Sequence, residues 1–261
     1  QNADLVIAIG CRMDYSITGF NRKQFARAAK VVVVDIDQAE IDKLDDLPEL
    51  RVVADATDFI NHLGLAISER PQPDYGEWIT RCKDWKERYP VVLPEYYAQC
   101  GYSNTYVFTK ILCEELESTD LLIPGSSGAS IDTFWLAAQL KDGQRAVATG
   151  GLGAMGYGLP AAIGGCIGSN ERRTISVDGD GGFMLNIQEL EVVRRLRLPI
   201  KFFILNNNGY ASIRASQTGY FKEVIGCDSD SGLTLPDICK VATALRSSHS
   251  ELPTNKTCAL Q

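Results

Sequence analysis

The sequence predicts an α/β protein with two domains, each a doubly wound parallel sheet of the Rossmann-like or flavodoxin-like kind. Three observations support this prediction. Short apolar runs rich in β-branched residues alternate with longer helix-like stretches in both halves of the chain. Glycine-rich polar turns directly follow several of these runs. A proline-rich segment separates the two halves, as a linker between domains would.

The first domain is predicted over residues 1–69. Two apolar runs, DLVIAIG at residues 4–10 and KVVVVDID at residues 30–37, are typical of parallel strands that are buried on both faces. RVVAD at residues 51–55 predicts a third strand, and the stretch after it predicts a helix.

Four residues at the ends of these strands are candidates for contact with a nucleotide: Gly10, Arg12, Asp35 and Asp37. Arg12 suits a diphosphate, and Asp35 suits a ribose hydroxyl. The two acidic residues serve equally well as helix N-caps, so nucleotide binding and a purely structural turn remain alternatives.

The second domain is predicted over residues 95–245, after a linker at residues 70–94 and before an irregular tail at residues 246–261. Its first element is an amphipathic helix that Ser103 can cap. DLLIPGSSG (residues 120–128) then predicts a strand and a turn. RAVATGGLGAMGYGLPAAIGG (residues 145–165) predicts a glycine-rich loop that enters a helix.

The next crossover is the clearest one. RTISVDGDGG (residues 173–182) predicts a strand that ends in a Gly-Asp-Gly turn, residues 183–198 predict one helix, and IKFFIL (residues 200–205) predicts another strand. This order implies a right-handed parallel crossover. The polar turns after the two strands therefore lie at the same carboxyl edge of the sheet, where ligands bind.

Hard oxygen ligands follow both strands. Asp180 offers a carboxylate, Asn207 an amide oxygen and the backbone near Gly209 a carbonyl, all of which Mg²⁺ accepts beside phosphate oxygens and water. The glycines around Asp180 let an anion approach, and the helix that begins near Phe183 points its N-terminus at it. Each turn alone is typical of an ordinary βα connection, but the two at this spacing favour a metal and diphosphate site.

The combined pattern GDGGF...NIQEL...LPIKFFILNNNGY resembles the magnesium and diphosphate signature of thiamine-diphosphate enzymes, in particular the acetolactate synthase-like carboligases and decarboxylases. TGGLGAMGYGLPAAIGG resembles the loop that precedes this signature in the family. ADLVIAIGCRMDYSITG and VVVVDIDQAEI resemble the family's middle domain, which binds FAD or another nucleotide in some members. The resemblance covers residues 1 to about 245.

The resemblance implies a role for each residue of the signature. Asp180 and Asn207 would bind Mg²⁺ through their side chains, and Gly209 would bind it through its backbone carbonyl. Gly181 and Gly182 would donate backbone amides to the diphosphate.

The resemblance also implies that Met155 wedges under the cofactor and forces it into a bent shape, for which a core methionine is the structural alternative. The loop GSSGAS differs in length from its counterpart in the family, and the residues after the metal turn could instead begin an exposed helix. Three pairs of residues are thus expected at the cofactor: Gly153 and Met155, Ser127 and Gly128, and Ser212 and Ile213.

A dinucleotide-binding site is the rival interpretation. Gly151, Gly153 and Gly156 spell G-x-G-x-x-G, and Asp178 ends the next strand about 20 residues later, as in an NAD-dependent oxidoreductase. Pro160 stands where the phosphate-binding helix should begin, and this interpretation leaves Asp180 and Asn207 without a role.

The chain departs from the family in one respect. Members of the family activate the cofactor with a glutamate from a pyrimidine-binding domain, and no such domain is recognisable here, so no catalytic residue is assigned. We expect a fragment that is truncated at both ends, with a partner subunit of a homodimer or homotetramer supplying the missing domain. A naturally split enzyme is the alternative.

The implied function is a thiamine-diphosphate- and Mg²⁺-dependent carboligase or decarboxylase. Its substrate would be a 2-oxo acid, and an aldehyde or a second 2-oxo acid would accept the transferred group. We expect the isolated chain to be inactive. A subunit that binds the cofactor without catalysis is the alternative.

The composition excludes several other classes of function. The chain has 26 basic and 33 acidic side chains and a net charge of -7, which argues against nucleic acid or an anionic membrane as the main partner. Its apolar runs are shorter than the roughly 18 residues of a membrane span. The eight cysteines form no C-x-x-C pair, so reduced thiols in a cytoplasmic protein are expected.

Overall fold

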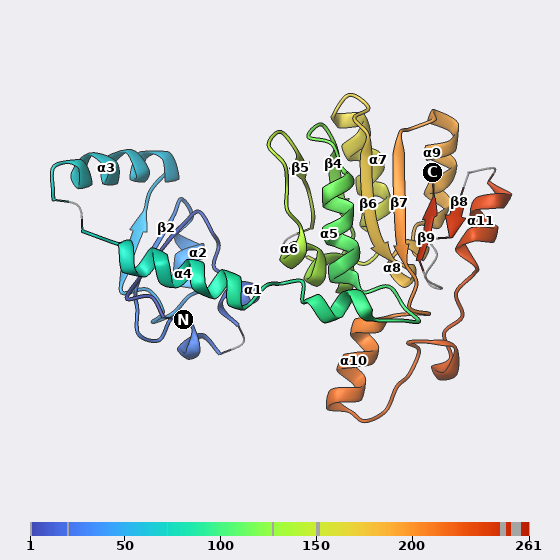
Figure 1. Cartoon of the computed structure of the whole chain (residues 1–261), viewed down its shortest axis with the longest axis horizontal. Helices are drawn as coiled ribbons and strands as arrows, with labels where there is room; N and C mark the ends of the chain where they lie inside the picture. The colour runs from blue at the N-terminus through green and yellow to red at the C-terminus, as the bar shows by residue number, and fades with distance from the viewer. Residues whose placement is uncertain are drawn as a thin grey trace. The chain divides into compact units, whose positions relative to one another are not determined.

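The computed structural model describes residues 2–19, 21–71, 73–126, 128–149, 152–245, 249–251 and 257–260 (Figure 1). The chain divides into two compact units, Gln1–Trp85 and Lys86–Gln261. The boundary between them falls inside helix α4 (Gly76–Arg88), within the segment that the sequence predicts as a linker.

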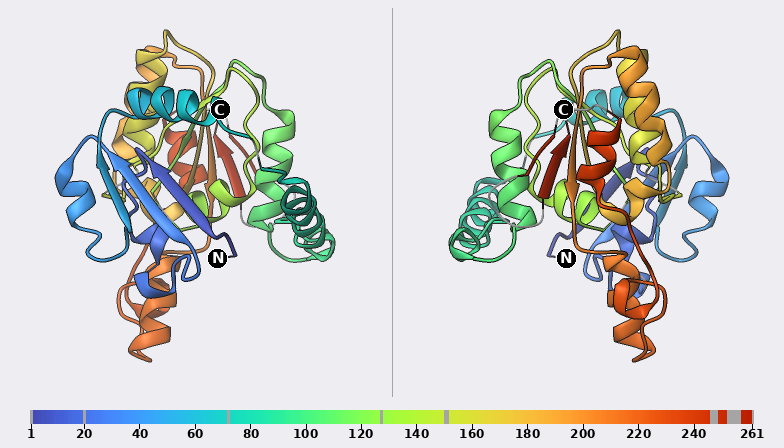
Figure 2. Two further views of the ribbon diagram at one scale, coloured as in Figure 1. Left: turned by 90° about the vertical axis from the view of Figure 1, so that its left-hand side faces the viewer. Right: turned by 90° about the vertical axis from the view of Figure 1, so that its right-hand side faces the viewer.

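The first unit is built on a parallel sheet in the order β1-β2-β3, which the left view of Figure 2 shows. The strands are β1 (Leu5–Ile9), β2 (Lys30–Asp35) and β3 (Leu50–Val53). The other elements are α1 (Tyr15–Thr18), the 3₁₀ turn Arg22–Gln24, α2 (Gln38–Asp42), α3 (Ala56–Ser68) and α4.

One face of this sheet carries a core. Val31 and Val33 of β2 pack with Ala8, Ile41 and Leu44. The prediction that the strands are buried on both faces fails for β1, because Leu5 and Ile7 are 50% and 40% exposed. The alternation of buried and exposed positions follows the two-residue period of a strand that is packed on one side only.

The strand-end residues of this unit have structural partners. The Asp37 carboxylate accepts the Ala39 N–H at 2.8 Å and caps α2, and Asp35 accepts the Asp37 N–H at 3.0 Å. Arg12 forms an ion pair with Glu40 at 3.3 Å. The capping alternative therefore accounts for Asp37 without a nucleotide.

The second unit is built on a larger sheet in the order β5-β4-β6-β7-β9-β8. The four parallel strands are β4 (Leu121–Pro124), β5 (Arg145–Ala146), β6 (Thr174–Gly179) and β7 (Ile200–Leu205). Two short antiparallel strands, β8 (His249–Glu251) and β9 (Thr257–Leu260), extend the sheet beyond β7. The segment that the sequence predicts as an irregular tail thus contains both of these strands.

Helices cover both faces of the parallel strands. The α-helices of this unit are α5 (Thr105–Glu115), α6 (Phe134–Ala137), α7 (Gly158–Gly168), α8 (Asp180–Met184), α9 (Leu190–Leu196), α10 (Ala211–Tyr220) and α11 (Ile238–Ala244). A π-helical turn (Ala129–Thr133) precedes α6, and 3₁₀ turns occupy Pro94–Ala98, Ile187–Glu189 and Ser229–Ser231.

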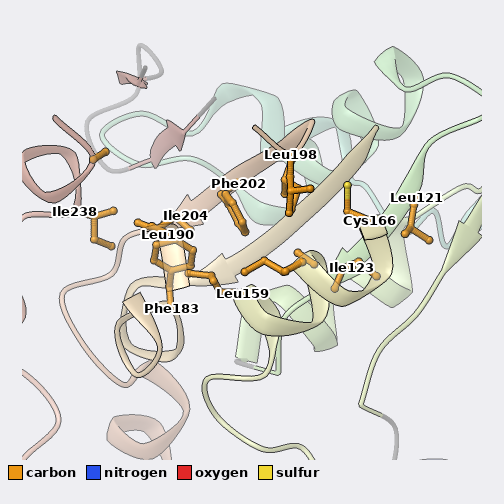
Figure 3. Packing of buried hydrophobic residues seen from close by; sticks show 14 residues of the cluster. Leu121, Ile123, Leu159, Cys166, Phe183, Leu190, Leu198, Phe202, Ile204 and Ile238 are labelled. Carbon is orange, nitrogen blue, oxygen red and sulfur yellow. The ribbon is translucent and has the colours of Figure 1, made fainter. Parts of the chain in front are cut away.

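Successive residues of β4 face different cores. Leu121 and Ile123 join the cluster that includes Phe183 and Phe202, whose rings lie 5.4 Å apart edge to face (Figure 3). Leu122 joins the second cluster, on the side of α5 and α6. Both faces of the sheet are therefore apolar, and every residue of β6 is buried, as a doubly wound fold requires.

Two local predictions differ from the structure. Asn104, and not Ser103, caps α5, since its side chain accepts the N–H groups of Tyr106 and Val107. The single helix predicted over residues 183–198 is divided into α8 and α9, with Asn186 between them. Asn186 has a non-helical φ of -131°, and its side chain donates to the Gly156 carbonyl at 2.8 Å.

None of the helices in the described part of the chain has the length and apolar character that a bilayer crossing requires.

Candidate functional site

The turns after β6 and β7 meet at the carboxyl edge of the second sheet. Asp180 directly follows β6, and its carboxylate accepts the Gly209 N–H at 2.9 Å and the Asn207 N–H at 3.4 Å. The parallel pairing of β6 with β7 brings the two turns side by side. The structure thus brings together the three residues that the sequence singles out as metal ligands.

The Asp180 carboxylate is buried, with only 3% of the residue exposed. Burial raises the pKa of this carboxyl, and hydrogen bonds from the backbone N–H groups of Gly209, Asn207 and Gly181 act in the opposite direction. A cation beside the carboxylate would offset the cost of burying its charge.

Asn207 presents a buried acceptor to the same place. Among the residues that the structure describes, no hydrogen-bond donor reaches its side-chain Oδ1. A buried acceptor without a donor costs about 1–3 kcal/mol, which a bound cation would remove. Together with the Asp180 carboxylate, this amide oxygen is a ligand set that suits Mg²⁺.

Gly209 is required by the close packing of its turn. Its φ is +140°, and a Cβ at this position would lie 1.9 Å from the Cys227 carbonyl oxygen. The main chain of Cys227 therefore presses directly on the turn, and a side chain here would push the two segments apart.

A pocket of about 110 Å³ opens beside this turn. Its lining includes eight of the residues that the sequence predicts at the cofactor or the metal: Gly128, Met155, Gly181, Gly182, Asn207, Gly209, Ser212 and Ile213. Asp180 does not line the pocket but lies buried next to it. Gly153 is also absent from the lining, and Ser127 lies outside the residues that the structure describes.

Two hydrogen bonds tie the glycine-rich loop that carries Met155 to the rest of the unit. The Ser126 hydroxyl donates to the Ala154 carbonyl, and the Asn186 amide donates to the Gly156 carbonyl. Met155 is 38% exposed and lines the pocket, so it is not the core methionine of the structural alternative.

The first turn of α10 adds backbone donors to the pocket. Tyr210 is the N-cap of this ten-residue helix, and its side chain makes no capping hydrogen bond. The first N–H groups of a helix have no partner within the helix, so those of Ala211, Ser212 and Ile213 suit an anion.

Sequence reasoning missed part of the pocket, including Ser126, Ser130, Tyr210 and Ala211. The two serines belong to the same short GSSGAS stretch as Ser127 and Gly128, and the other two separate Gly209 from Ser212. These four residues could have been predicted at the pocket from their positions in the two loops, but not from their residue types.

The acid of the rival interpretation lies away from solvent. Asp178 is 1% exposed, and its carboxylate accepts the Gly179 N–H at 2.8 Å. A carboxylate that is buried in this way cannot reach the ribose of a dinucleotide, so the placement of Asp178 does not favour an NAD site.

Comparisons with known proteins agree with the geometry. Residues 1–63 match the central domain of thiamine pyrophosphate enzymes, and residues 128–256 match their C-terminal TPP binding domain. The acetolactate synthase large subunit of Porphyra purpurea is 33% identical over 228 residues, which are 85% of this chain and 37% of that protein. The large subunit of Pyropia yezoensis is 32% identical over 251 residues, covering 94% of this chain and 40% of that protein.

A plant relative gives the same result. The chloroplastic acetolactate synthase of Arabidopsis thaliana is 31% identical over 227 residues, which are 85% of this chain and 33% of that protein. The chain thus spans between 33% and 40% of the length of these relatives. It belongs to the thiamine pyrophosphate-dependent, acetolactate synthase-like enzyme family.

Proposed function

We propose that this chain carries the magnesium and diphosphate half of a thiamine diphosphate site, in a carboligase or decarboxylase that acts on a 2-oxo acid. The observation that carries the proposal is the pair of buried oxygens at one edge of the sheet: the Asp180 carboxylate, and the Asn207 Oδ1, which accepts no hydrogen bond from the described part of the chain. Both are hard ligands; Asn207 lines the pocket, and Asp180 lies buried next to it.

Three residues would hold the cation. Asp180 and Asn207 would bind it through side-chain oxygens and Gly209 through its carbonyl, which leaves room in an octahedral shell for phosphate oxygens and water. Gly181 and Gly182 line the same pocket and would donate backbone N–H groups to the diphosphate. The first turn of α10 would add further donors.

Met155, on the glycine-rich loop, lines the same pocket and would support the cofactor. Its apolar side chain would keep water from the reacting end, and Gly153 on the same loop would contact the aminopyrimidine edge. When bound, thiamine diphosphate supplies a nucleophilic carbon and an electron sink for breaking or forming a bond next to a carbonyl. The chain's own part is to hold and orient this group.

A partner subunit with a pyrimidine-binding domain belongs to the same proposal, since no residue of this chain is assigned as the activating glutamate. The full assembly would be a homodimer or homotetramer. We also propose a cytoplasmic location; seven cysteines with described side chains are free, although the Arabidopsis thaliana relative is chloroplastic. Binding of FAD or another nucleotide to the first unit remains a weaker proposal.

Calorimetric titration of thiamine diphosphate into the chain, with and without Mg²⁺, tests the proposal. Asp180→Asn and Asn207→Ala should each greatly weaken Mg²⁺-dependent binding, whereas Asp142→Asn, which alters an exposed carboxylate, should not. Heat from NAD but not from thiamine diphosphate would contradict the proposal.

Catalysis needs a second measurement, because a subunit that only binds the cofactor is the alternative. After a pyrimidine-binding domain is supplied, a 2-oxo acid should release carbon dioxide or form a 2-hydroxyketone. Cofactor binding without turnover in that mixture would favour the non-catalytic alternative.

A further inference from the structure

Arg214 connects the metal turn to a distant loop. It lies in the first half of α10, and its Nη2 donates to the Asn207 carbonyl at 3.3 Å. Its Nη1 forms an ion pair with Asp228 Oδ2 at 2.9 Å. The Arg214 and Asp228 side chains are 32% and 19% exposed, so solvent screens this pair less than it screens a surface pair.

Asp228 is itself held in place. Its Oδ1 accepts the Ser231 N–H at 3.1 Å and the Ser231 hydroxyl at 2.7 Å. The Ser231 hydroxyl oxygen in turn accepts the Asp228 N–H at 3.0 Å, which completes a capping box. Arg214 is thus paired with an anchored carboxylate and not with a mobile one.

The neighbouring residue fixes the other end of the turn. The Cys227 carbonyl accepts the Tyr210 N–H at 2.9 Å and packs against Gly209. Residues 227 and 228 therefore support the turn at two points, through the backbone of Tyr210 and through the side chain of Arg214. Asn207, whose Oδ1 is the buried acceptor, lies between the strand β7 and this support.

We propose that Arg214 and Asp228 are positioning residues that hold Asn207 in the geometry needed to bind Mg²⁺. The inference rests on the proposed function, because it takes Asn207 as a metal ligand. Ligands need support from surrounding hydrogen bonds, and loss of such support typically lowers metal affinity by about 10- to 100-fold. Lysine cannot replace Arg214 fully, since one ammonium lacks the fork that reaches two acceptors.

The test compares Mg²⁺ affinity in four proteins at a fixed concentration of thiamine diphosphate: the unaltered chain, Arg214→Ala, Arg214→Lys and Asp228→Asn. We expect the dissociation constant for Mg²⁺ to rise by about 10- to 100-fold in Arg214→Ala and by less in Arg214→Lys and Asp228→Asn. Arg194→Ala is the matched control, because it removes an exposed ion pair with Glu191 on α9 and should leave the affinity unchanged.

A second measurement needs no ligand. Hydrogen exchange of the Asn207 and Gly209 amides, which donate to Asp180, should be faster in Arg214→Ala and unchanged in Arg194→Ala. If Arg214→Ala does not fold, Arg214→Lys and Asp228→Asn carry both measurements.

The outcomes separate this inference from the proposed function. Absence of Mg²⁺-dependent binding in the unaltered chain would overturn both. Normal binding in the unaltered chain together with Mg²⁺ affinity within twofold in a folded Arg214→Ala would overturn this inference alone. Unchanged amide exchange at Asn207 and Gly209 would also overturn it.

Discussion

The Asp180 carboxylate accepts the Gly209 N–H at 2.9 Å, although the two residues are 29 positions apart in the sequence. The bond joins the turn after β6 to the turn after β7, and it holds a buried carboxylate next to the pocket. The two turns therefore support each other, and a substitution that distorts either turn should weaken Mg²⁺ binding.

Gly209→Ala should destabilise the protein and disrupt the metal site together. The new Cβ would lie 1.9 Å from the Cys227 carbonyl oxygen, at a φ of +140° that alanine rarely adopts. We expect a loss of about 3 kcal/mol in the free energy of unfolding, from overpacking and backbone strain combined. Urea unfolding measures the loss, and calorimetry should show no Mg²⁺-dependent binding of thiamine diphosphate.

Gly164→Ala is the control for this experiment. Gly164 lies inside α7, and nothing within 4 Å would meet its Cβ. Alanine here should stabilise the helix by about 0.5–1 kcal/mol and leave cofactor binding intact. Equal stability changes in the two variants would show that the Cys227 contact does not constrain Gly209.

Protons should compete with Mg²⁺ at Asp180. Burial raises the pKa of this carboxyl above its usual value, and only the ionised form binds a cation. Mg²⁺ affinity should be full above the raised pKa and fall by about tenfold per pH unit below it. Without metal, the raised pKa also affects stability. The free energy of unfolding should fall as pH rises from the pKa of this carboxyl in the unfolded chain to its raised pKa in the folded protein, because the folded state holds the proton more tightly.

Calorimetry of Mg²⁺ binding at a series of pH values from neutral into the acid range checks this expectation. The phosphate groups of the cofactor titrate at about pH 6 and add a pH dependence of their own, so the comparison that matters is with Asp180→Asn. The variant should bind Mg²⁺ weakly at every pH and lack the carboxyl's share of the pH dependence. Identical pH profiles in the two proteins would contradict the role of Asp180.

The sequence predicted the parts of the site that depend on the backbone path. Asp180 and Asn207 follow consecutive strands of a βαβ crossover, and the parallel direction of these two strands brings their turns to one edge. Gly128 and Met155 were expected at the cofactor from the family resemblance and Ser212 from its place just after the metal turn, and all three line the pocket.

The parts that could not be predicted depend on tertiary contacts. Asn186 lies at the break between α8 and α9, and its side chain holds the Gly156 carbonyl, a contact between residues 30 positions apart that helical periodicity does not reveal. The link from Arg214 to Asn207 depends in the same way on how the loop at Asp228 folds back. Local sequence patterns contain no signal for either contact.

Gly128 and Ser212 should be energetically coupled. A Cβ on Gly128 would lie 2.4 Å from the Ser212 hydroxyl oxygen but 3.8 Å from the Ser212 Cβ. Gly128→Ala alone should therefore lower both the stability and the cofactor affinity. In a Ser212→Ala background the hydroxyl is absent, so Gly128→Ala should lower the free energy of unfolding by about 1 kcal/mol less than it does in the unaltered chain. A double-mutant cycle of urea unfolding measures this coupling, and additive effects would mean that the two residues do not meet.

Asp120 and Arg173 should matter for stability and not for cofactor binding, because they lie just before β4 and β6, at the opposite edge of the sheet from the pocket. Arg173 grips the Asp120 carboxylate with two hydrogen bonds of 2.6 Å, and the Glu117 N–H donates to it at 2.7 Å. Burial acts to raise the pKa of Asp120, but these hydrogen bonds and the charges of Arg173 and Lys141 outweigh it and lower the pKa.

Asp120→Asn should lower the free energy of unfolding by about 2 kcal/mol at pH 7. This loss is smaller than for a fully buried ion pair that loses one partner, because the Arg173 side chain is 37% exposed and solvent screens its charge. Since the folded-state pKa is lowered, this stability is present above the unfolded pKa of about 3.9 and is lost as pH falls through the folded value. Urea unfolding from pH 7 to pH 3 should therefore show the free energies of unfolding of the two proteins converging in acid, with equal affinities for Mg²⁺ and thiamine diphosphate at neutral pH.

Glu191→Gln, which breaks the exposed pair with Arg194, is the control and should change stability within the error of measurement. A constant difference between Asp120→Asn and the unaltered chain at every pH would show that the lost stability comes from packing and not from the charge of Asp120.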